Sequence, residues 1–534
     1  MNGVVIIGAG LSGLSAAIAL AQNNVQSYLV SLQPSERAQS VLAEGGINAA
    51  LDTMGENDSV QNHFDDTMRG GAYLADPNAV DALTKAAPET VRWLISLGAA
   101  FNVINSEPVL RNFGGQKKKR TAFAKSSTGK IIMTALIDEA RKYEEKGLIK
   151  RLPHHELIRI ITENGDCIGA RIKDTYTDKI FDLLGQVIIC SGGLNGIFPE
   201  MTTGTTQNSG NCAAVLFSQG VRFSNLEMIQ YHPTTIGISG KRCLITEAAR
   251  GEGGRLWIMT KEDKPWYFME EKYPELGNLM PRDVVSREMF FVRRRDDTIG
   301  EVYLNMTEIP EQVWKSRLSD LRDGIIKYTG DDPRYTPIAV HEGIHYFMGG
   351  IDVDDRHRTS MKGLYAAGEC CSQYHGANRL GGNSMLGAVF GGKRAAETVL
   401  MSELSEVTMQ PFDDDDEFSA EPTEQLIRQQ RDILLSALGI VRNEEDINKA
   451  LSALDKLTEI KDLNAADRAR IMLGRGMLMS ALERRESRGA HYREDYPEAD
   501  ETMRKKSLSY VEDNKLFTQF CDIPERRAAN EDQA

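Results

Sequence analysis

The N-terminal segment has the most regular pattern of apolar and small residues in the chain. Residues 4–7 (VVII) form an apolar run that predicts a buried strand, and residues 8–13 (GAGLSG) predict a glycine-rich turn. Residues 14–21 are helix formers, and residues 28–30 form a second short apolar run. The segment therefore predicts a strand, a tight turn, a helix and a second strand, the beginning of a parallel α/β unit.

The glycines of this turn indicate a dinucleotide site. Gly8 would make the tight turn, Gly10 would let a pyrophosphate approach the backbone, and Gly13 would let the helix pack on the sheet. The N-terminus of the helix would then face the phosphates. The acidic residue expected after the second strand of an NAD site is absent, because that strand ends at Ser31. This weakens the case for NAD as the dinucleotide.

The pattern changes several times along the rest of the chain. Helical patterns extend to about residue 100, and residues 150–195 are rich in β formers. Residues 235–345 are mixed and polar, and they interrupt the nucleotide-binding unit. That unit resumes with a strand-like segment at 363–369.

The C-terminal part begins with a linker near Pro411. The acidic run Asp413 to Glu417 predicts a solvated connector. From Thr423 onward, charged residues alternate with Leu, Ile and Met at helical spacing, so we expect helices.

Composition narrows the class of protein. The chain has 534 residues, 41% of them apolar and 26% charged, which is ordinary for a globular protein with a large core. Its net charge of −14 argues against a nucleic-acid partner. The seven cysteines form no CxxC pair, which fits a reducing compartment. No leader precedes the first strand and no segment is long and apolar enough to cross a bilayer, so we expect a cytoplasmic protein.

Residues 375–394 (HGANRLGGNSMLGAVFGGKR) carry the densest chemical signal. Their glycines let the main chain approach a ligand closely and leave backbone N–H groups free to bind it. Arg379 adds a planar guanidinium suited to a carboxylate. The alternative interpretation of the segment alone is a glycine-rich turn before a helix.

Residues 341–345 (HEGIH) match the H-E-x-x-H pattern of zinc proteases. That pattern requires a helix, on which both imidazoles share one face. Here Pro337 precedes the pattern and Gly343 interrupts it, so the segment is predicted to be loop and strand. On a strand, His341 and His345 would lie about 13 Å apart, too far to bind one ion, and we expect no metal.

A series of motifs in a fixed order resembles the flavoprotein subunit family of succinate dehydrogenase and fumarate reductase, which also includes L-aspartate oxidase. The resemblance extends over nearly the whole chain. The motifs are GAGLSG at 8–13, LAEGGINAA at 42–50, FGGQ at 113–116, QYHPT at 230–234, LITEAARGEGG at 244–254, PRDVVSR at 281–287, HYFMGG at 345–350, GLYAAGEC at 363–370, HGANRLGGNS at 375–384 and ERRESRGAHYREDYP at 483–497.

The resemblance implies an α/β fold in which a Rossmann-like FAD-binding domain is interrupted by an α+β capping domain and followed by a C-terminal helical domain. The expected FAD-binding domain comprises residues 1–235 and 346–405. The expected capping domain, which would carry the substrate, comprises residues 236–345, and the C-terminal helical domain comprises residues 406–534.

The resemblance also implies a C4-dicarboxylate substrate between the flavin and the capping domain. Arg379 and His345 would hold one carboxylate, and His232 and Thr246 would hold the other. Such charge-assisted contacts are short and strong in a dry site. The expected reaction interconverts fumarate and succinate, with hydride delivered from flavin N5.

By the same resemblance, Arg282 is the proton donor and is supplied through Glu247 and Arg250. A guanidinium is a weak acid, so this role requires precise positioning near a strongly basic carbanion. The alternatives are that Arg282 only adds positive charge, and that Glu247 and Arg250 simply pair on one helical face.

The FAD contacts implied by the resemblance fall in every part of the expected FAD-binding domain. Ser40, Gly45 and Gly46 would lie on the pyrophosphate side, and Glu369 would contact the ribityl chain or the isoalloxazine. The full set is Gly8, Gly10, Leu11, Ser12, Gly13, Ser31, Ser40, Glu44, Gly45, Gly46, Gly193, Asn211, Glu369, Asn383, Ser384 and Leu386.

Some positions depart from the family pattern. Gln39 stands where the respiratory enzymes have the His that tethers FAD, so we expect non-covalent FAD and a preference for fumarate reduction. Asn211 stands where Asp is usual. Phe347 replaces a small polar residue, which is expected to reshape the substrate pocket.

The motifs favour three enzymatic functions, and they leave a non-enzymatic flavin-binding module or a metalloprotease as the remaining alternatives. The first is a fumarate reductase flavoprotein subunit with an iron–sulfur subunit as its electron partner. The second is L-aspartate oxidase, whose members place a Glu before Gly-Gly-His-Ser to meet the substrate ammonium. This chain has Phe113 at that position, and Phe cannot pair an ammonium in a closed site. The third is a reductase of another unsaturated carboxylate.

Overall fold

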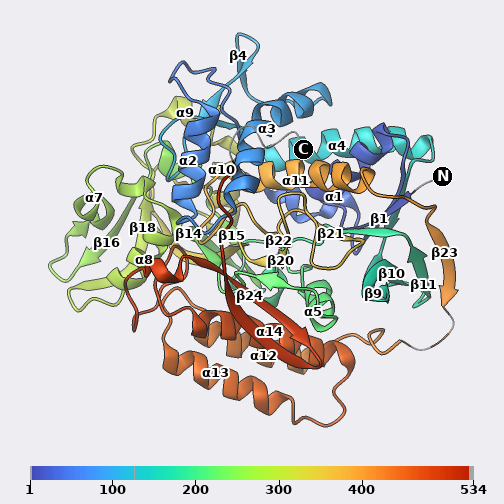
Figure 1. Cartoon of the computed structure of the whole chain (residues 1–534). Helices are drawn as coiled ribbons and strands as arrows, with labels where there is room; N and C mark the ends of the chain where they lie inside the picture. The colour runs from blue at the N-terminus through green and yellow to red at the C-terminus, as the bar shows by residue number, and fades with distance from the viewer. Residues whose placement is uncertain (1–2, 126, 413, 415, 528–534) are drawn as a thin grey trace.

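The computed structural model describes residues 3–125, 127–412, 414 and 416–527 (Figure 1). A five-stranded parallel sheet forms the centre of the FAD-binding region. Its strands are, in spatial order, β21 (Leu364–Ala366), β12 (Gln186–Ile189), β1 (Gly3–Ile7), β2 (Gln26–Ser31) and β8 (Ile149–Pro153). Every residue of β1 is buried, because helices and a second sheet cover the two faces of this parallel sheet.

Helix α1 (Leu11–Gln22) packs closely against α11 (Asn383–Leu400) on one face of this sheet. The close approach of the two helices depends on Gly392, where a Cβ would lie 2.1 Å from the Ser12 carbonyl oxygen. The packing of α1 against the turn that precedes it depends on Gly13, where a Cβ would lie 1.9 Å from the Gly8 carbonyl oxygen. The predicted strand, turn, helix and strand at the N-terminus is therefore confirmed, and Gly13 has the packing role expected of it.

The remaining elements of this region surround the sheet. A second, four-stranded sheet has the order β23 (Thr408–Phe412), β11 (Ile180–Leu184), β10 (Asp166–Asp174) and β9 (His155–Glu163). The peripheral elements are α2 (Val60–Gly70), α3 (Pro77–Ser96), α4 (Thr128–Glu145), α5 (Asn211–Ser218), the small sheet β3 (Ile47–Asn48), β7 (Thr121–Ala122) and β6 (Leu110–Arg111), and the hairpin β4 (Val103–Ile104) and β5 (Glu107–Pro108).

A six-stranded sheet carries the capping region. Its order is β15 (Lys241–Leu244), β14 (Ile229–Ile238), β19 (Ile338–Phe347), β18 (Thr298–Asn305), β16 (Arg255–Thr260) and β17 (Pro265–Trp266). Its helices are α6 (Ala248–Gly251), α7 (Phe268–Lys272), α8 (Arg282–Val292), α9 (Glu311–Ser316) and α10 (Ser319–Thr329). The two expected boundaries of the capping domain fall inside β14 and β19, so these long paired strands connect it to the rest of the chain.

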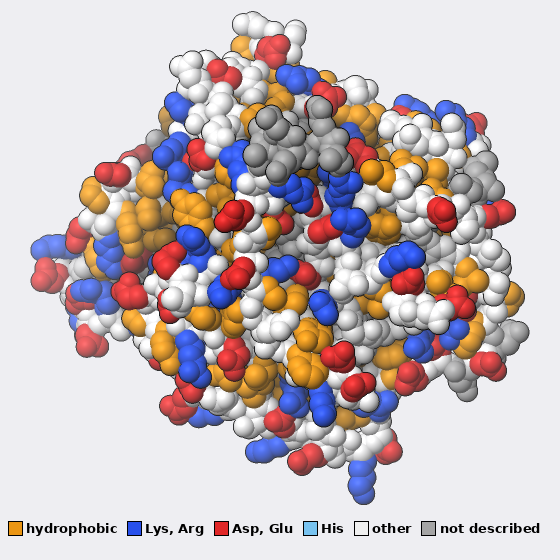
Figure 2. All heavy atoms as spheres, viewed as in Figure 1, with side chains coloured by type: hydrophobic (Ala, Val, Ile, Leu, Met, Phe, Trp, Pro, Cys, Tyr) orange, Lys and Arg blue, Asp and Glu red, His pale blue; other side chains and the backbone are white. Residues whose placement is uncertain are grey.

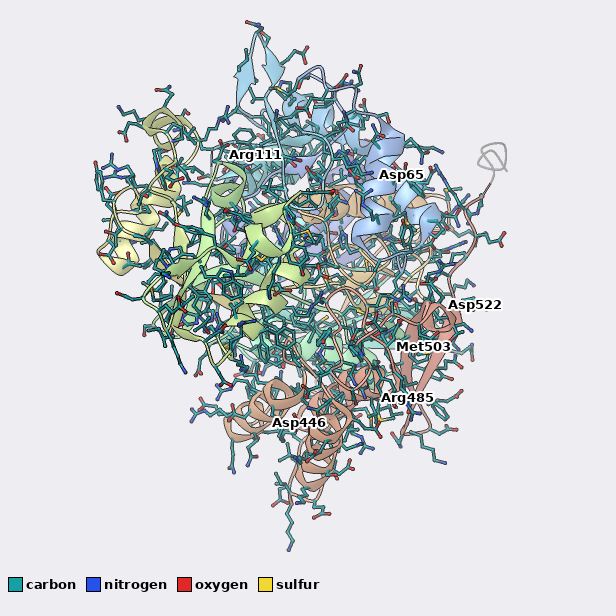
Figure 3. All side chains as sticks on the ribbon, turned by 90° about the vertical axis from the view of Figure 1, so that its left-hand side faces the viewer. Asp65, Arg111, Asp446, Arg485, Met503 and Asp522 are labelled. Atoms are coloured by element: carbon teal, nitrogen blue, oxygen red, sulfur yellow. The ribbon has the colours of Figure 1, made fainter. Side chains whose placement is uncertain are left out.

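The α-helices of the C-terminal region are, among the described residues, α12 (Glu424–Ala437), α13 (Glu444–Leu457) and α14 (Ala465–Glu483). These helices lie at the bottom of the molecule (Figure 1), and a side view places Asp446 of α13 and Asp65 of α2 at opposite ends (Figure 3). Charged side chains of both signs are interspersed over the face in Figure 2.

The expectation of helices from Thr423 onward was wrong for residues 505–522. Strands β24 (Lys505–Glu512) and β25 (Lys515–Asp522) form a hairpin that extends a sheet of β13 (Phe223–Ser224), β20 (Gly350–Asp352) and β22 (Cys371–Ser372). Asp513 and Asn514 both have positive φ, the turn geometry that matches the twist of two adjacent strands. This Asp-Asn turn was the sequence signal for the hairpin.

The acidic connector is not solvated throughout. The Asp416 carboxylate is buried and lies 2.7 Å from the Arg171 guanidinium. Asp413 and Asp415 lie outside the described residues. The reason for the difference is that β23 joins the sheet of β11, which brings the connector onto Arg171.

Candidate active site

A cavity of about 300 Å³ lies between the central sheet and the capping region. Its walls include the turn after β1, the end of β2 and the loop after β12, so it opens at the carboxyl ends of the parallel strands, where such folds bind ligands. Most of the residues expected to contact FAD line it. They are Gly8, Gly10, Leu11, Ser12, Ser31, Ser40, Glu44, Gly45, Gly46, Gly193, Asn211, Glu369 and Ser384.

Gly13, Asn383 and Leu386 do not line the cavity, although they were expected to contact FAD; Gly13 packs against the Gly8 carbonyl oxygen instead. Asn383 is fully buried, and its Oδ1 lies 2.7 Å from Asn48 Nδ2 and 3.0 Å from His63 Nε2. Leu386 lies in the hydrophobic core behind it. Both face into the protein because α11 presents Ser384 and Met385 to the cavity instead.

The N-terminus of α1 fits the pyrophosphate of a dinucleotide. The Leu11 backbone N–H donates to Ser40 Oγ at 3.2 Å, which joins the glycine turn to the loop at 39–46. A Cβ at Gly10 would lie 3.1 Å from the same Ser40 oxygen, which is a tight contact, so glycine keeps this passage open. The helix of 12 residues directs its N-terminus, the positive end of its dipole, at the cavity.

Gln39 lines the cavity at the position of the expected tether. Its amide oxygen accepts a hydrogen bond from the Thr205 backbone N–H, so its side chain links two walls of the cavity. An amide offers no nucleophilic ring nitrogen for a covalent bond to a cofactor.

At the other end of the cavity, Glu247 connects two arginines. Its Oε2 accepts from Arg282 Nε at 2.8 Å, its Oε1 accepts from the Gly114 N–H at 2.7 Å, and Arg250 Nη2 lies 3.7 Å from Oε1. Burial would raise the pKa of Glu247, but Arg282 and Arg250 outweigh it and hold that pKa below its usual value. Arg250 lies behind Glu247 and does not line the cavity. The three side chains therefore form a series of contacts that leads from Arg282 at the cavity through Glu247 to Arg250.

Gln230, which the sequence analysis did not select, joins the two cavity arginines. Its Oε1 accepts from Arg282 Nη1 at 3.1 Å and from Arg379 Nη2 at 3.0 Å. Its Nε2 donates to Asn378 Oδ1 at 2.7 Å. The residue stands two positions before His232 in the QYHPT motif, and on a strand this spacing places both on one face. That spacing was the signal for its role.

His232, His345 and Thr246 face the same void as these arginines. The two imidazole centroids lie 5.1 Å apart, and Thr203 Oγ1 lies 2.7 Å from His345 Nδ1. Burial and the charge of Arg282 hold the pKa of both histidines well below the usual value. Both rings are therefore neutral at pH 7 and act as hydrogen-bond groups, not as cations.

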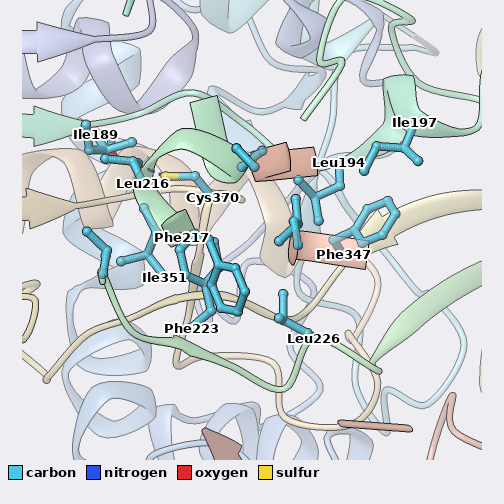
Figure 4. Packing of buried hydrophobic residues seen from close by; sticks show 14 of the residues in the cluster. Ile189, Leu194, Ile197, Leu216, Phe217, Phe223, Leu226, Phe347, Ile351 and Cys370 are labelled. Atoms are coloured by element: carbon cyan, nitrogen blue, oxygen red, sulfur yellow. Dashed lines mark hydrogen bonds between the residues drawn. The ribbon is translucent and has the colours of Figure 1, made fainter. Parts of the chain in front are cut away.

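A bulge in β19 directs His345 and Tyr346 into the cavity together. Gln230 pairs with Tyr346 and Tyr231 pairs with Ile344, so His345 is the extra residue on its strand. Phe347 consequently turns away. Its ring is 2% exposed, stacks with Phe198 and packs in the core (Figure 4). The expectation that Phe347 reshapes the substrate pocket was wrong, because the bulge reverses the facing of the following residue.

The strand β19 also contains the residues that match the zinc-protease pattern. Residues 341–345 lie on β19, as predicted, and not on a helix. His345 faces the cavity, whereas His341 is partly exposed and lies 3.5 Å from Glu301. In the described part of the chain, no His, Cys, Asp and Glu side chains form a group that could hold a metal ion.

Positive charge predominates where the void meets the capping region. Glu247 contacts Arg250 and Arg282 but not Arg379, and Glu369 is a second carboxylate in the cavity wall that attracts Arg379. Burial lowers the pKa of Arg379 to about 9, which still leaves it a cation at pH 7. Its Nε has no hydrogen-bond partner within the described residues. A buried guanidinium with a free donor beside neutral imidazoles suits an anionic ligand.

Glu44, which also lines the cavity, should make the stability of the folded protein depend on pH. Burial raises the pKa of Glu44 to about 8, with Arg111 opposing that shift. Since the unfolded value is about 4.3, the folded state binds this proton more tightly, and its stability falls as the pH rises from about 5 to 8. We expect Glu44→Gln, which does not titrate, to gain about 1–3 °C in Tm over wild type between pH 5 and pH 8 in the FAD-free protein. A Tm difference that is constant with pH would contradict this.

Comparisons with known proteins agree with the site. Residues 3–385 match the family model described as FAD binding domain, and residues 428–522 match the model described as fumarate reductase flavoprotein C-term. The chain is therefore an FAD-binding protein, and the cavity at the N-terminus of α1 fits that cofactor.

The full-length relatives narrow the class further. The chain is 35% identical over 568 residues to the succinate dehydrogenase flavoprotein subunit of Bacillus subtilis, covering 98% of this chain and 97% of the relative. It is 34% identical over 519 residues to the L-aspartate oxidase of Pyrococcus furiosus, covering 96% and 100%. A solved E. coli quinol fumarate reductase FrdA chain superimposes with a TM-score of 0.85 at 27% identity, covering 98% and 96%.

The chain belongs to the family of succinate dehydrogenase and fumarate reductase flavoproteins, which includes L-aspartate oxidase, and it is an FAD-dependent oxidoreductase. The resemblance based on motifs, the α/β fold with its FAD-binding region and the expectation of FAD are thereby confirmed. None of the helices in the described ranges has both the length and the apolar character to cross a bilayer.

Proposed function

We propose that this protein reduces fumarate to succinate as the flavoprotein subunit of a fumarate reductase. The observation that supports this most strongly is the shared void of Arg282, Arg379, His232 and His345. Two cations joined through the amide of Gln230, with neutral imidazoles beside them, match a small dianion. FAD, when bound in the cavity, supplies hydride transfer.

We assign the two ends of the dianion to different walls of the void. Arg379 and His345 hold one carboxylate, and His232 and Thr246 hold the other. The Thr234 N–H donates to His232 Nδ1 at 3.3 Å, so the Nε2–H of the neutral ring is directed at the ligand. Fixed donors of this kind draw electron density from the double bond without reorganisation, which favours hydride acceptance at the adjacent carbon.

Arg282 is the proposed proton donor to the other alkene carbon. It lines the void, and its Nε and Nη2 both bond to Glu247, at 2.8 and 2.6 Å. This two-pronged contact holds the guanidinium in one orientation, which a weak acid needs in order to be effective. Once Arg282 has given up its proton, the ionised Glu247 accepts a proton from Arg250 and passes it to Arg282, and Arg250 is reprotonated in turn.

L-aspartate oxidase is the second candidate, because an enzyme of that name matches the chain from end to end. An amino-acid substrate needs an acceptor for its ammonium. Phe113 occupies a wall of the cavity where such a carboxylate is expected, and it is 2% exposed. Glu247 is already bonded by Arg282 and by the Gly114 N–H. A third candidate, reduction of another unsaturated acid, would use the same anion site.

One experiment separates these functions. Purified FAD-loaded protein should oxidise reduced viologen when fumarate is added, and it should form no peroxide with L-aspartate and oxygen. Peroxide from L-aspartate, with no fumarate-dependent oxidation of viologen, would support the oxidase instead. Viologen oxidation with other unsaturated acids but not with fumarate would support the third candidate.

Non-covalent attachment of FAD gives a separate prediction. Because Gln39 cannot form a tether, acid precipitation of the yellow protein should release its flavin into the supernatant, and dialysis against high salt should yield FAD-free protein that regains its colour on addition of FAD. Absorbance at the flavin band measures both. Flavin that stays with the precipitated protein after washing would contradict the prediction.

A fumarate reductase flavoprotein needs a partner that supplies electrons to its FAD. Related chains are named as flavoprotein subunits of succinate dehydrogenase and fumarate reductase. We propose an iron–sulfur subunit as the partner of this chain and a location in the cytoplasm. Co-purification of an iron-containing polypeptide from native cells would support the partner, and recovery of active flavoprotein alone would contradict it.

A further inference from the structure

Tyr346 lines the cavity beside His345, the bulged residue of β19, and it has no part in the reaction proposed for the site. Its ring lies against Arg379, with the guanidinium carbon 4.5 Å from the ring centroid. Its hydroxyl lies 3.2 Å from His375 Nε2, and the two rings meet edge to face at 5.3 Å. Tyr346 and His375 are both buried.

Arg379 has few other contacts that could orient it. Its Nη2 donates to Gln230 at 3.0 Å, and its Nη1 is 3.5 Å from the Leu380 carbonyl oxygen, at the limit of a hydrogen bond. Its Nε has no partner in the described chain. A long, flexible side chain held by one good hydrogen bond could rotate about it. The face of Tyr346 is the remaining surface against which the guanidinium plane rests.

We propose that Tyr346 is a positioning residue that holds the Arg379 guanidinium in the orientation required to bind a carboxylate, and that His375 fixes the Tyr346 ring. This inference rests on the proposed dianion site. The pair is not a proton route, because His375 Nδ1 is buried and has no partner among the described residues. The role of His375 is therefore to fix the Tyr346 ring, and that ring positions the Arg379 guanidinium.

Two substitutions separate the ring face from the hydroxyl. Tyr346→Phe keeps the face, and Tyr346→Leu removes it. We would titrate the FAD-loaded proteins with malonate, a dianion without a reducible double bond, and follow the flavin absorption spectrum. We expect Leu to weaken malonate binding by about tenfold and Phe by no more than about twofold. Unchanged affinity in Tyr346→Leu, or equal losses in both variants, would overturn the proposal.

The chain contains a matched control pair. Tyr28 is buried, its hydroxyl lies 3.0 Å from Lys150 Nζ, the same ammonium nitrogen lies 4.8 Å from its ring centroid, and it does not line the cavity. Tyr28→Leu removes the same ring and the same kind of contact with a cation. We expect it to lower Tm while leaving malonate affinity at the wild-type value. An equal loss of malonate affinity would show that any buried tyrosine matters in this way, and would overturn the proposal.

A double-mutant cycle tests the contact without a bound dianion. We would measure Tm for the FAD-loaded Tyr346→Leu, Arg379→Met and doubly substituted proteins. Direct contact predicts that the double variant loses clearly less than the sum of the single losses. Additive losses would overturn the contact itself. If the wild type binds no malonate, the proposed dianion site fails, and the cycle still decides whether Tyr346 holds Arg379.

Discussion

Arg282→Lys should reduce fumarate-dependent turnover by about 10²–10⁴-fold, although it preserves the positive charge. Arg282 bonds Glu247 through two nitrogens and Gln230 through a third. A lysine ammonium is a single point and cannot keep both contacts from one position. Proton transfer should therefore fail while the substrate still binds. Stopped-flow oxidation of reduced viologen gives the turnover, and malonate titration gives the affinity.

The size of this effect separates the two roles considered for Arg282. If Arg282 only adds charge to the site, Arg282→Lys will retain turnover within a few-fold of wild type. Arg287→Lys is the matched control, since Arg287 is on the same helix and does not line the cavity. We expect this control variant to retain both turnover and FAD content.

Arg379→Met should lower kcat/KM for fumarate by about 10²–10³-fold, with malonate affinity reduced to a similar extent. The methionine fills similar space against Tyr346 but removes the buried cation that has a free Nε donor. Since a carboxylate in a dry site is then left without its ionic partner, ground-state binding and catalysis should decline together.

The matched control for this second variant is Arg394→Met, on α11 and outside the cavity wall. It should leave malonate affinity unchanged. Full malonate affinity in Arg379→Met would mean that the anion binds elsewhere and would remove the basis of the proposed clamp. FAD absorbance and Tm, measured for each variant, exclude misfolding as the cause.

Local patterns were sufficient for the elements whose geometry depends on neighbouring residues. The apolar run 4–7, the glycine turn and the helix after it are all present, because each depends on side-chain size and backbone freedom within a few positions. The strand at 341–345 was likewise predicted from Pro337 and Gly343 around it. The terminal hairpin was missed because its strands are stabilised by β13, a segment far away in the chain.

The chemistry of the site was predictable as a set of residue types, and its assembly was not. Arg282 comes from the start of α8, His232 from β14 and Arg379 from the loop before α11. Only the closure of the capping sheet on the central sheet brings them to one void. Gln230 and Tyr346 acquire their importance there, through contacts with arginines that are distant in sequence.

The amino-acid sequence by itself determined that residues 4–31 form a dinucleotide-binding unit, since the positive φ of Gly8 favours glycine in its tight turn, and it contained the motifs of its family. The tertiary structure alone decided which side chains face the ligand. A one-residue bulge in β19 turned Phe347 into the core and Tyr346 toward Arg379. The physical reason is that strand register depends on a partner strand, so the facing of each residue is settled only when the two strands pair.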